Sequence, residues 1–233
     1  MKHVARFYSE VPMADGIEVS LSPDQMSHAT MALRLTNSGI VRVFNAEYGE
    51  WECKITDTVK RSVRCVSQIH PARIEKGASV ACALINPKRF DFFLEKATEL
   101  GIGEIIPIIS QRTQPQRINW VKSRQKIIHA CEQCRRFSVP VLREVIQMKD
   151  FLRKYASDYK ILVGDERLSV QTLANILEEK CVFLVGPEGG FSDDEHNLFN
   201  VHPNVHKFTF GKNILRTETA AVVFTAIWGS KFI

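Results

Sequence analysis

The chain has 233 residues, of which 45% are hydrophobic and 24% are charged, and its formal net charge is +5. This composition is typical of a soluble globular protein and excludes a disordered chain. No apolar run is long enough to span a membrane, and the first residues lack a signal-peptide core, so we expect a cytoplasmic protein with no membrane partner.

Residues 1–72 alternate short strand-like segments with turn signals, which favours a small barrel or sandwich. The expected strands are residues 4–8, 17–21, 40–46, 51–56 and 63–69. Between the second and third strands, Ser22, Pro23 and Asp24 predict the start of a helix over residues 25–35, because proline is favoured in a first turn.

Residues 73–233 follow a linker and predict an α/β unit. An apolar strand at 79–85, a helix from Asn86 to Leu100 that stops at Gly101, and a strand at 104–109 form one strand, helix, strand unit, which implies parallel pairing. A helix at 120–137, a strand at 159–163 and a helix at 170–178 follow. We therefore expect a parallel sheet flanked by helices.

Positive charge gathers between residues 111 and 150, where nine Lys and Arg side chains stand against three Asp and Glu. This local excess exceeds the surplus of the whole chain and indicates a polyanion partner. The alternative is an ordinary solvated helix face.

The six cysteines are scattered and predict no disulfide framework. Cys131 and Cys134 have the spacing of a metal or redox pair, but a zinc site needs two further ligands at matching spacing. We expect reduced cysteines and no bound metal.

Two glycine-bearing loops near the end of the chain predict a ligand site. Residues 181–185 read as a buried parallel strand, and Gly-Pro-Glu-Gly-Gly-Phe follows at 186–191. Ser192 and Glu195 form a capping-box pattern that starts a helix. Residues 208–210 then read as the end of a second strand, Gly211 as a turn, and Arg216 as the start of the last helix. We expect the two strands to be neighbours, so that the loops at their carboxyl ends form one crevice.

The segments Gly-Pro-Glu-Gly-Gly-Phe at 186–191 and Ile-Leu-Arg-Thr-Glu-Thr-Ala at 214–220 resemble the RsmE family of the SPOUT superfamily. The resemblance implies S-adenosylmethionine-dependent methylation of uracil N3 in the 16S ribosomal RNA of the small ribosomal subunit. It also implies a PUA-like RNA-binding β-barrel at 1–72, a SPOUT methyltransferase domain at 73–233 with a C-terminal trefoil knot, and a homodimer.

The resemblance implies catalytic, cofactor-binding and RNA-binding residues. We expect Arg216 to stabilise the uracil anion as a cation, and Glu218 or Glu188 to act as the general base. The residues expected to bind S-adenosylmethionine are Leu184, Gly186, Pro187, Glu188, Gly189, Phe210, Gly211, Asn213, Ile214, Leu215 and Thr219. Those expected to bind RNA are Arg6, Arg34, Arg112, Arg124, Arg135 and Arg136.

Two other functions fit parts of the pattern. One is a non-catalytic RNA-binding protein, against which the two intact glycine loops speak. The other is a nucleotide-binding α/β enzyme of different chemistry, which the missing phosphate-loop and dinucleotide fingerprints disfavour.

Overall fold

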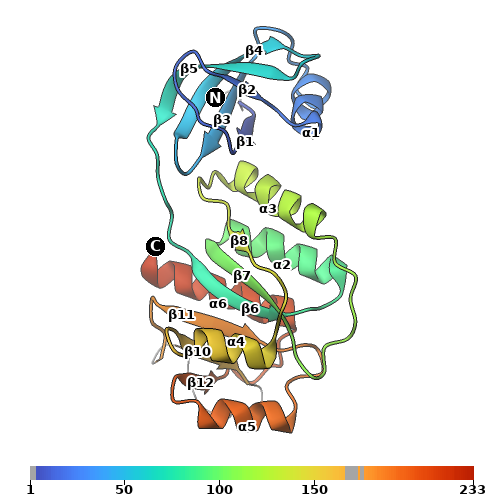
Figure 1. Cartoon of the computed structure of the whole chain (residues 1–233), viewed down its shortest axis with the longest axis vertical. Coiled ribbons are helices and arrows are strands. Elements are labelled where there is room, and N and C mark those ends of the chain that lie inside the picture. The colour runs from blue at the N-terminus through green and yellow to red at the C-terminus, as the bar shows by residue number, and fades with distance from the viewer. Residues whose placement is uncertain (1–3, 166–172, 174–175) are drawn as a thin grey trace. The chain divides into compact units, whose positions relative to one another are not determined.

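The computed structural model describes residues 4–165, 173 and 176–233. The chain divides into two compact units, Met1–Glu75 with Ile128–Val139, and Lys76–Ile127 with Pro140–Ile233 (Figure 1). These ranges differ from the expected 1–72 and 73–233, because a stretch far along the chain groups with the N-terminal residues.

The N-terminal unit contains one five-stranded sheet among its described residues, in the order β1-β3-β4-β5-β2. The strands are β1 (Arg6–Tyr8), β2 (Glu18–Ser20), β3 (Ile40–Asn45), β4 (Gly49–Asp57) and β5 (Ser62–His70). β1 pairs with β3 in parallel and the other pairs are antiparallel. All five expected strands are therefore confirmed. β1 and β2 lie at opposite edges of this sheet, and among the described residues they do not pair with each other. A closed barrel therefore stays a prediction.

The prediction of one continuous helix over residues 25–35 is wrong. The chain makes a short α-helix, α1 (Pro23–Ser27), followed by a π-helical turn, η1 (His28–Ala32). Ser22 caps α1 in a capping box with Gln25, as the proline-containing start suggested. Arg34 then has a φ of 55°, a left-handed conformation that ends the helical run.

The C-terminal unit contains a parallel sheet of seven strands among its described residues. The strands are β6 (Ala78–Ala83), β7 (Ile102–Ile109), β8 (Val141–Leu142), β9 (Ile146–Gln147), β10 (Lys160–Gly164), β11 (Cys181–Val185) and β12 (Val205–Phe208). Their order is β12-β10-β11-β6-β7-β8, and β9 also pairs with β7. The predicted parallel sheet is thus confirmed. All five residues of β11 are buried, since it lies inside the sheet.

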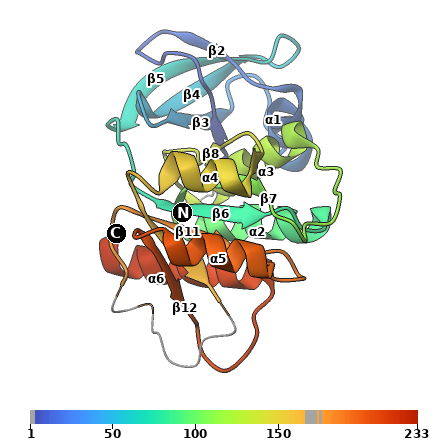
Figure 2. The same ribbon diagram turned by 60° about the horizontal axis from the view of Figure 1, so that its bottom comes forward.

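Helices cover both faces of this sheet. They are α2 (Pro87–Glu99), α4 (Met148–Tyr155), α5 (Asp193–Val201) and α6 (Thr217–Phe232). A further helix, α3 (Trp120–Cys134), belongs to this unit up to Ile127 and to the N-terminal unit from Ile128 on. Figure 2 shows α4 and α5 on the near side of the sheet. Phe151 of α4 and Phe199 of α5 share one apolar core with β7, β10 and β11. The helices α2 and α6 pack on each other, α2 also packs on β7, and α6 on β6 and β11. The sheet is therefore the middle of three layers.

The helix expected at 86–100 is confirmed, with Asn86 as its N-cap and Gly101 after it at a φ of 95°. α3 ends at Cys134, three residues before the expected end, because Arg135 has a left-handed φ of 64°. The helix expected at 170–178 falls largely outside the described residues.

Sequence reading missed β8, β9 and α4. The two strands have two residues each, too few to show a period. α4 did carry a signal, because its buried residues are Met148, Phe151, Leu152 and Tyr155, at helical spacing. Across the described ranges, no helix combines the length and the apolar character needed to cross a membrane.

Candidate functional site

A cavity of about 360 Å³ lies in the C-terminal unit, where β10, β11 and β12 end. Its volume is in the range of small-molecule binding pockets. It is lined by Arg89, Gly164, Asp165, Val185, Gly186, Pro187, Glu188, Gly190, Phe191, Phe208, Thr209, Phe210, Asn213, Ile214, Leu215, Arg216, Thr217 and Ala220. Both predicted glycine loops therefore contribute to one site.

The first loop follows β11 and is shaped by its glycines. Gly190 has a φ of 65°, and its N–H donates to the carbonyl of Pro187 at 2.9 Å, which closes a turn. A Cβ on Gly186 would lie 3.1 Å from the ring of Phe191, which is buried against the loop. Ser192 then caps α5, with the predicted capping box to Glu195. The loop thus presents main chain to the cavity.

The second loop follows β12, which ends at Phe208, earlier than the strand end expected at 208–210. A tight turn follows, in which Oγ1 of Thr209 donates to the carbonyl of Gly211 at 2.9 Å and accepts from the N–H of Gly211 at 3.2 Å. Gly211 has a φ of 139°, which disfavours other residues. α6 then begins at Thr217, whose hydroxyl donates to the carbonyl of Gly186 at 2.7 Å.

The two loops meet although their strands are not neighbours. We expected adjacent strands, and this is wrong, because β10 lies between β11 and β12. Gly164 and Asp165, at the end of β10, line the cavity between the two loops. Asp165 is buried, 3.4 Å from Nδ1 of His196. Sequence reading missed both residues because the end of that strand carries no motif.

Seven of the eleven residues predicted to bind cofactor line the cavity: Gly186, Pro187, Glu188, Phe210, Asn213, Ile214 and Leu215. The other four do not. Leu184 is buried in the sheet core, and Thr219 is exposed on α6. Gly189 turns its carbonyl to Nη1 of Arg112 at 3.1 Å, and Gly211 is exposed.

Arg89 is a charged residue of the site that sequence reading missed. It lines the cavity from the first turn of α2, where the helix dipole disfavours a positive charge. Its Nη1 forms an ion pair with Glu188, and its Nε lies 3.9 Å from Oε1 of Glu218. The two carboxylates that pair with Arg89 lie about 100 or more positions further along the chain, so only the tertiary structure shows this cluster.

The two candidate bases have different surroundings. Glu188 lines the cavity with a half-exposed side chain. Glu218 lies behind the cavity wall, 7% exposed, and its Oε2 is buried with no hydrogen-bond partner among the described residues. Burial raises the pKa of the neighbouring Cys82 thiol, and the charge of Glu218 adds to the effect. Arg216 lines the cavity and is exposed.

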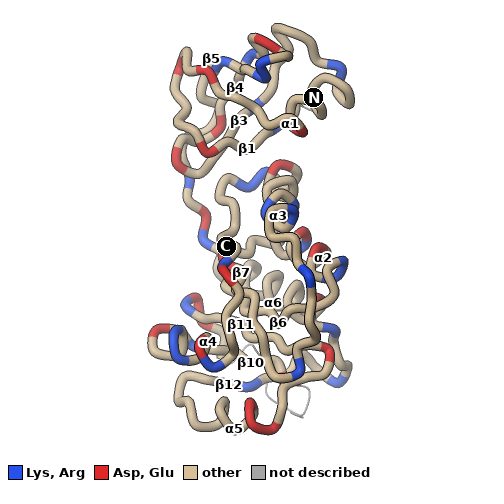
Figure 3. The backbone as a smooth tube through the Cα atoms, turned by 45° about the vertical axis from the view of Figure 1, so that its right-hand side comes forward, with Lys and Arg blue, Asp and Glu red and all other residues tan. Residues whose placement is uncertain are grey.

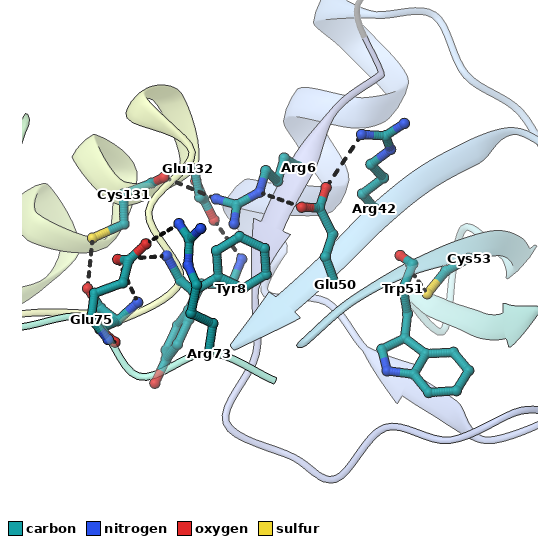
Figure 4. Close-up of polar contacts among 12 residues, drawn as sticks. Arg6, Tyr8, Arg42, Glu50, Trp51, Cys53, Arg73, Glu75, Cys131 and Glu132 are labelled. Carbon is teal, nitrogen blue, oxygen red and sulfur yellow. Dashed lines mark hydrogen bonds and ion pairs between the residues drawn. The ribbon is translucent and has the colours of Figure 1, made fainter. Parts of the chain in front are cut away.

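Two of the arginines predicted to bind RNA are instead buried in the N-terminal unit. Arg6 is 8% exposed, and Figure 4 shows its guanidinium directed to Glu50 and to the carbonyl of Cys131. Burial lowers its pKa, although Glu50 opposes the shift. Arg136 is also 8% exposed and lies 3.4 Å from Glu75. Because both guanidinium groups pair with carboxylates inside the unit, we leave both residues out of the RNA surface proposed below.

The other four predicted arginines, Arg34, Arg112, Arg124 and Arg135, are exposed. Figure 3 shows basic positions along the segment that leads into α3. Within the described ranges, no group of three or more His, Cys, Asp and Glu side chains is placed to hold a metal ion.

Fold and site together define an α/β protein with a ligand cavity at the carboxyl ends of parallel strands. Residues 73–229 match the family model of the RNA methyltransferase domain. The chain is 30% identical to Ribosomal RNA small subunit methyltransferase E of Rickettsia conorii, over 95% of this chain and 93% of the relative. The chain therefore belongs to the RsmE family of RNA methyltransferases.

Solved structures agree over almost the whole chain. A methyltransferase from Legionella pneumophila, in complex with bound cofactor SAM, superposes with a TM-score of 0.85 at 28% identity and covers 98% of each chain. Ribosomal RNA small subunit methyltransferase E from Neisseria gonorrhoeae, bound to S-adenosyl methionine, gives 0.80 at 26% identity, covering 99% of this chain and 100% of that one.

Proposed function

We propose that this protein transfers the methyl group of S-adenosylmethionine to N3 of one uridine in the 16S RNA of the small ribosomal subunit. Membership in the RsmE family makes the chain an S-adenosylmethionine-dependent rRNA methyltransferase. The choice of uracil as the target base, and of N3 as the target atom, rests on the motif resemblance. The observation that carries the proposal is the single cavity shared by the Gly186–Gly190 loop and the loop before α6.

The cavity suits an adenosyl cofactor. Main chain at Gly186 and Gly190 lies open to a ligand, while Phe210 and Leu215 offer apolar surface to an adenine ring. When bound, S-adenosylmethionine supplies an electrophilic methyl group on a sulfonium. The chain's task is then to hold the acceptor nitrogen in line with that methyl.

Uracil N3 bears a proton, so the base must lose it before the nitrogen can attack. Arg216 lines the cavity and is our candidate for the cation that stabilises charge on the uracil oxygens. Glu188 lines the cavity as well, whereas Glu218 would reach a substrate only after the wall moved. Glu188 is therefore the better-placed general base, with Glu218 as the alternative.

Further structural proposals rest on the family resemblance. We propose that the N-terminal domain is PUA-like and holds RNA, and that the C-terminal segment is knotted in the SPOUT manner. We also propose a homodimer, which is supported by the apolar α6, where Ile227 is 37% exposed. A cytoplasmic location follows from the proposed ribosomal substrate.

The decisive experiment is transfer of labelled methyl from S-adenosylmethionine to small ribosomal subunits that lack the modification, followed by mapping of the modified base. Free 16S RNA and assembled subunits are compared as substrates. We expect one labelled uridine, modified at N3. Label on another base or atom would overturn the specificity.

A measurement of cofactor binding distinguishes the proposed function from the two alternative functions. Calorimetry with S-adenosylmethionine, ATP and NAD should show binding of the first alone. Tight binding of RNA without S-adenosylmethionine binding would indicate a non-catalytic RNA-binding protein, and binding of ATP or NAD would indicate different chemistry.

A further inference from the structure

A second cavity of about 370 Å³ lies in the C-terminal unit and shares no lining residue with the cofactor site. It is a groove lined by Trp120, Arg124, Leu142, Arg143, Glu144 and Val145. The residues come from the start of α3 and from the strand β8 and its following loop. The proposed reaction assigns no role to them, apart from the expectation that Arg124 binds RNA.

Trp120 is held as a rigid platform in this groove. Its ring meets Phe90 edge to face, with ring centroids 6.2 Å apart and planes at 85°. Phe90 is fully buried, yet Trp120 keeps 38% of its surface exposed. On the other side, Leu142 is fixed by parallel pairing of β8 with Ile105 of β7. An aromatic ring that is anchored at one edge and open on the other side can stack a ligand ring.

The charge around the groove favours an anionic partner. Residues 111–127 contain five Lys and Arg and no Asp or Glu. Arg124 lies one helical turn after Trp120 and is exposed. Arg143 lines the groove too, although Glu104 pairs with it at 2.6 Å. Exposed aromatic surface beside guanidinium groups is the surface on which single-stranded RNA stacks its bases.

The same basic segment begins at the cofactor site. The N–H of Gln111 donates to Oε1 of Glu195 at 3.0 Å, and Nη1 of Arg112 donates to the carbonyl of Gly189 at 3.1 Å. Residues 112 to 120 span at most about 29 Å when fully extended. A short RNA strand can therefore reach from the cofactor loop to the groove along positive charge.

We infer that an unpaired nucleobase of the rRNA substrate stacks on Trp120 in this groove, while Arg112 and Arg124 neutralise phosphates of the strand that leads to the methyl acceptor. The inference rests on the proposed function, since it names where the same RNA is held. The groove thus selects a single-stranded flank of the target nucleotide.

The test compares Trp120→Ala with Trp120→Phe, and uses Phe92→Ala as the matched control. Phe92 is 50% exposed on α2 in the same unit but does not line the groove. Affinity is measured with a single-stranded 16S RNA fragment around the mapped uridine, at fixed salt. Trp120→Ala should weaken binding about ten-fold to a hundred-fold, as loss of one stacked base does. Trp120→Phe and Phe92→Ala should bind within about three-fold of the parent, a change below the smallest stacking loss.

Two further readouts sharpen the test. RNA should quench tryptophan fluorescence in Trp51→Phe, which removes the tryptophan of the N-terminal unit that we also propose to hold RNA. The quenching should vanish when Trp120→Phe is added, because the remaining Trp228 is buried. Arg124→Gln should lower the salt dependence of binding by about one unit of log–log slope. Unchanged affinity in Trp120→Ala, or quenching that persists when Trp120→Phe is added to Trp51→Phe, would overturn the inference.

Failure of the inference and failure of the proposed function look different. If the parent protein methylates rRNA and Trp120→Ala does so with the same KM, only the groove assignment is lost. If the parent binds S-adenosylmethionine but methylates no rRNA, the proposed function is lost. If Trp120→Ala dissociates a dimer in sedimentation without changing RNA affinity, the groove contacts a second copy of the chain, and the inference is wrong.

Discussion

The hydroxyl of Thr217 donates a hydrogen bond to the carbonyl of Gly186, with 2.7 Å between the two oxygens. The bond joins the first residue of α6 to the first residue of the loop after β11. These segments follow strands that do not touch, so this contact helps to hold the cavity together.

Thr217→Val should weaken S-adenosylmethionine binding, because it keeps the shape of the side chain but removes the donor. Loss of one hydrogen bond to a part-buried acceptor costs about 1–2 kcal/mol, or about five-fold to thirty-fold in the dissociation constant. Calorimetric titration checks the change. Thr225→Val is the matched control, since Thr225 is buried in the same helix and its hydroxyl donates to the carbonyl of Ala221 within that helix. Equal affinities of the two variants would contradict the role of Thr217.

Arg89→Gln should lower the free energy of unfolding. Glu218 is buried, and its Oε2 has no hydrogen-bond partner among the described residues. The substitution removes the guanidinium that lies 3.9 Å from its Oε1. Because Arg89 is about one-third exposed and the pair is long, we expect a loss of about 1–2 kcal/mol. Urea denaturation at constant m-value measures it. Arg153→Gln should change nothing measurable, since Arg153 is 82% exposed and pairs only with Asp150 among the described residues.

A double-mutant cycle separates charge from packing at this site. In Arg89→Gln with Glu218→Gln, no buried charge is left without a partner, so the double variant should be more stable than the sum of the two single losses predicts. Additive losses would show that Arg89 does not stabilise the Glu218 carboxylate.

Arg216→Ala should abolish methyl transfer while S-adenosylmethionine affinity stays within a few fold. The reason is that a cation acting on the uracil anion stabilises the transition state more than the bound cofactor. Arg216→Lys keeps the charge and should recover part of kcat. Single-turnover kinetics with small subunits measures the effect, and full activity of Arg216→Ala would refute the assignment.

The N-terminal unit should lose stability as pH falls through the ordinary titration range of Glu75. Burial opposes ionisation of this carboxyl, but Arg73, the N–H groups of Ser138 and Phe137, and Arg136 together lower its pKa from 4.5 (Figure 4). A lowered folded-state pKa means that the unfolded chain binds the proton more readily. The stabilisation is therefore full above about pH 5.5 and is lost as pH falls through 4.5 toward the lower folded-state pKa.

Glu75→Gln isolates this effect. The difference in unfolding midpoint between Glu75→Gln and the parent should be largest at neutral pH and should shrink as the pH falls below that range. Denaturant melts at several pH values measure it. A difference that is the same at every pH would show that the ionised form of Glu75 contributes nothing.

The sequence by itself determined the local elements. These elements depend on interactions between residues close together in the chain, and the structure confirms them. Examples are the apolar strand Cys181–Val185, the helix caps Ser22, Asn86 and Ser192, and the helix stop at Gly101. Two glycine motifs in order were also enough to indicate the family.

Only the tertiary structure decided which segments meet. The placement of β10 between β11 and β12, the ion pairs of Arg89 with carboxylates about 100 or more positions away, and the burial of Arg6 against Glu50 arise from strand order and packing. Such contacts leave no period or spacing in the sequence, because the partners are brought together only when the sheets form. The charge of an arginine is visible in the sequence, but whether it faces RNA or a buried carboxylate depends on the fold.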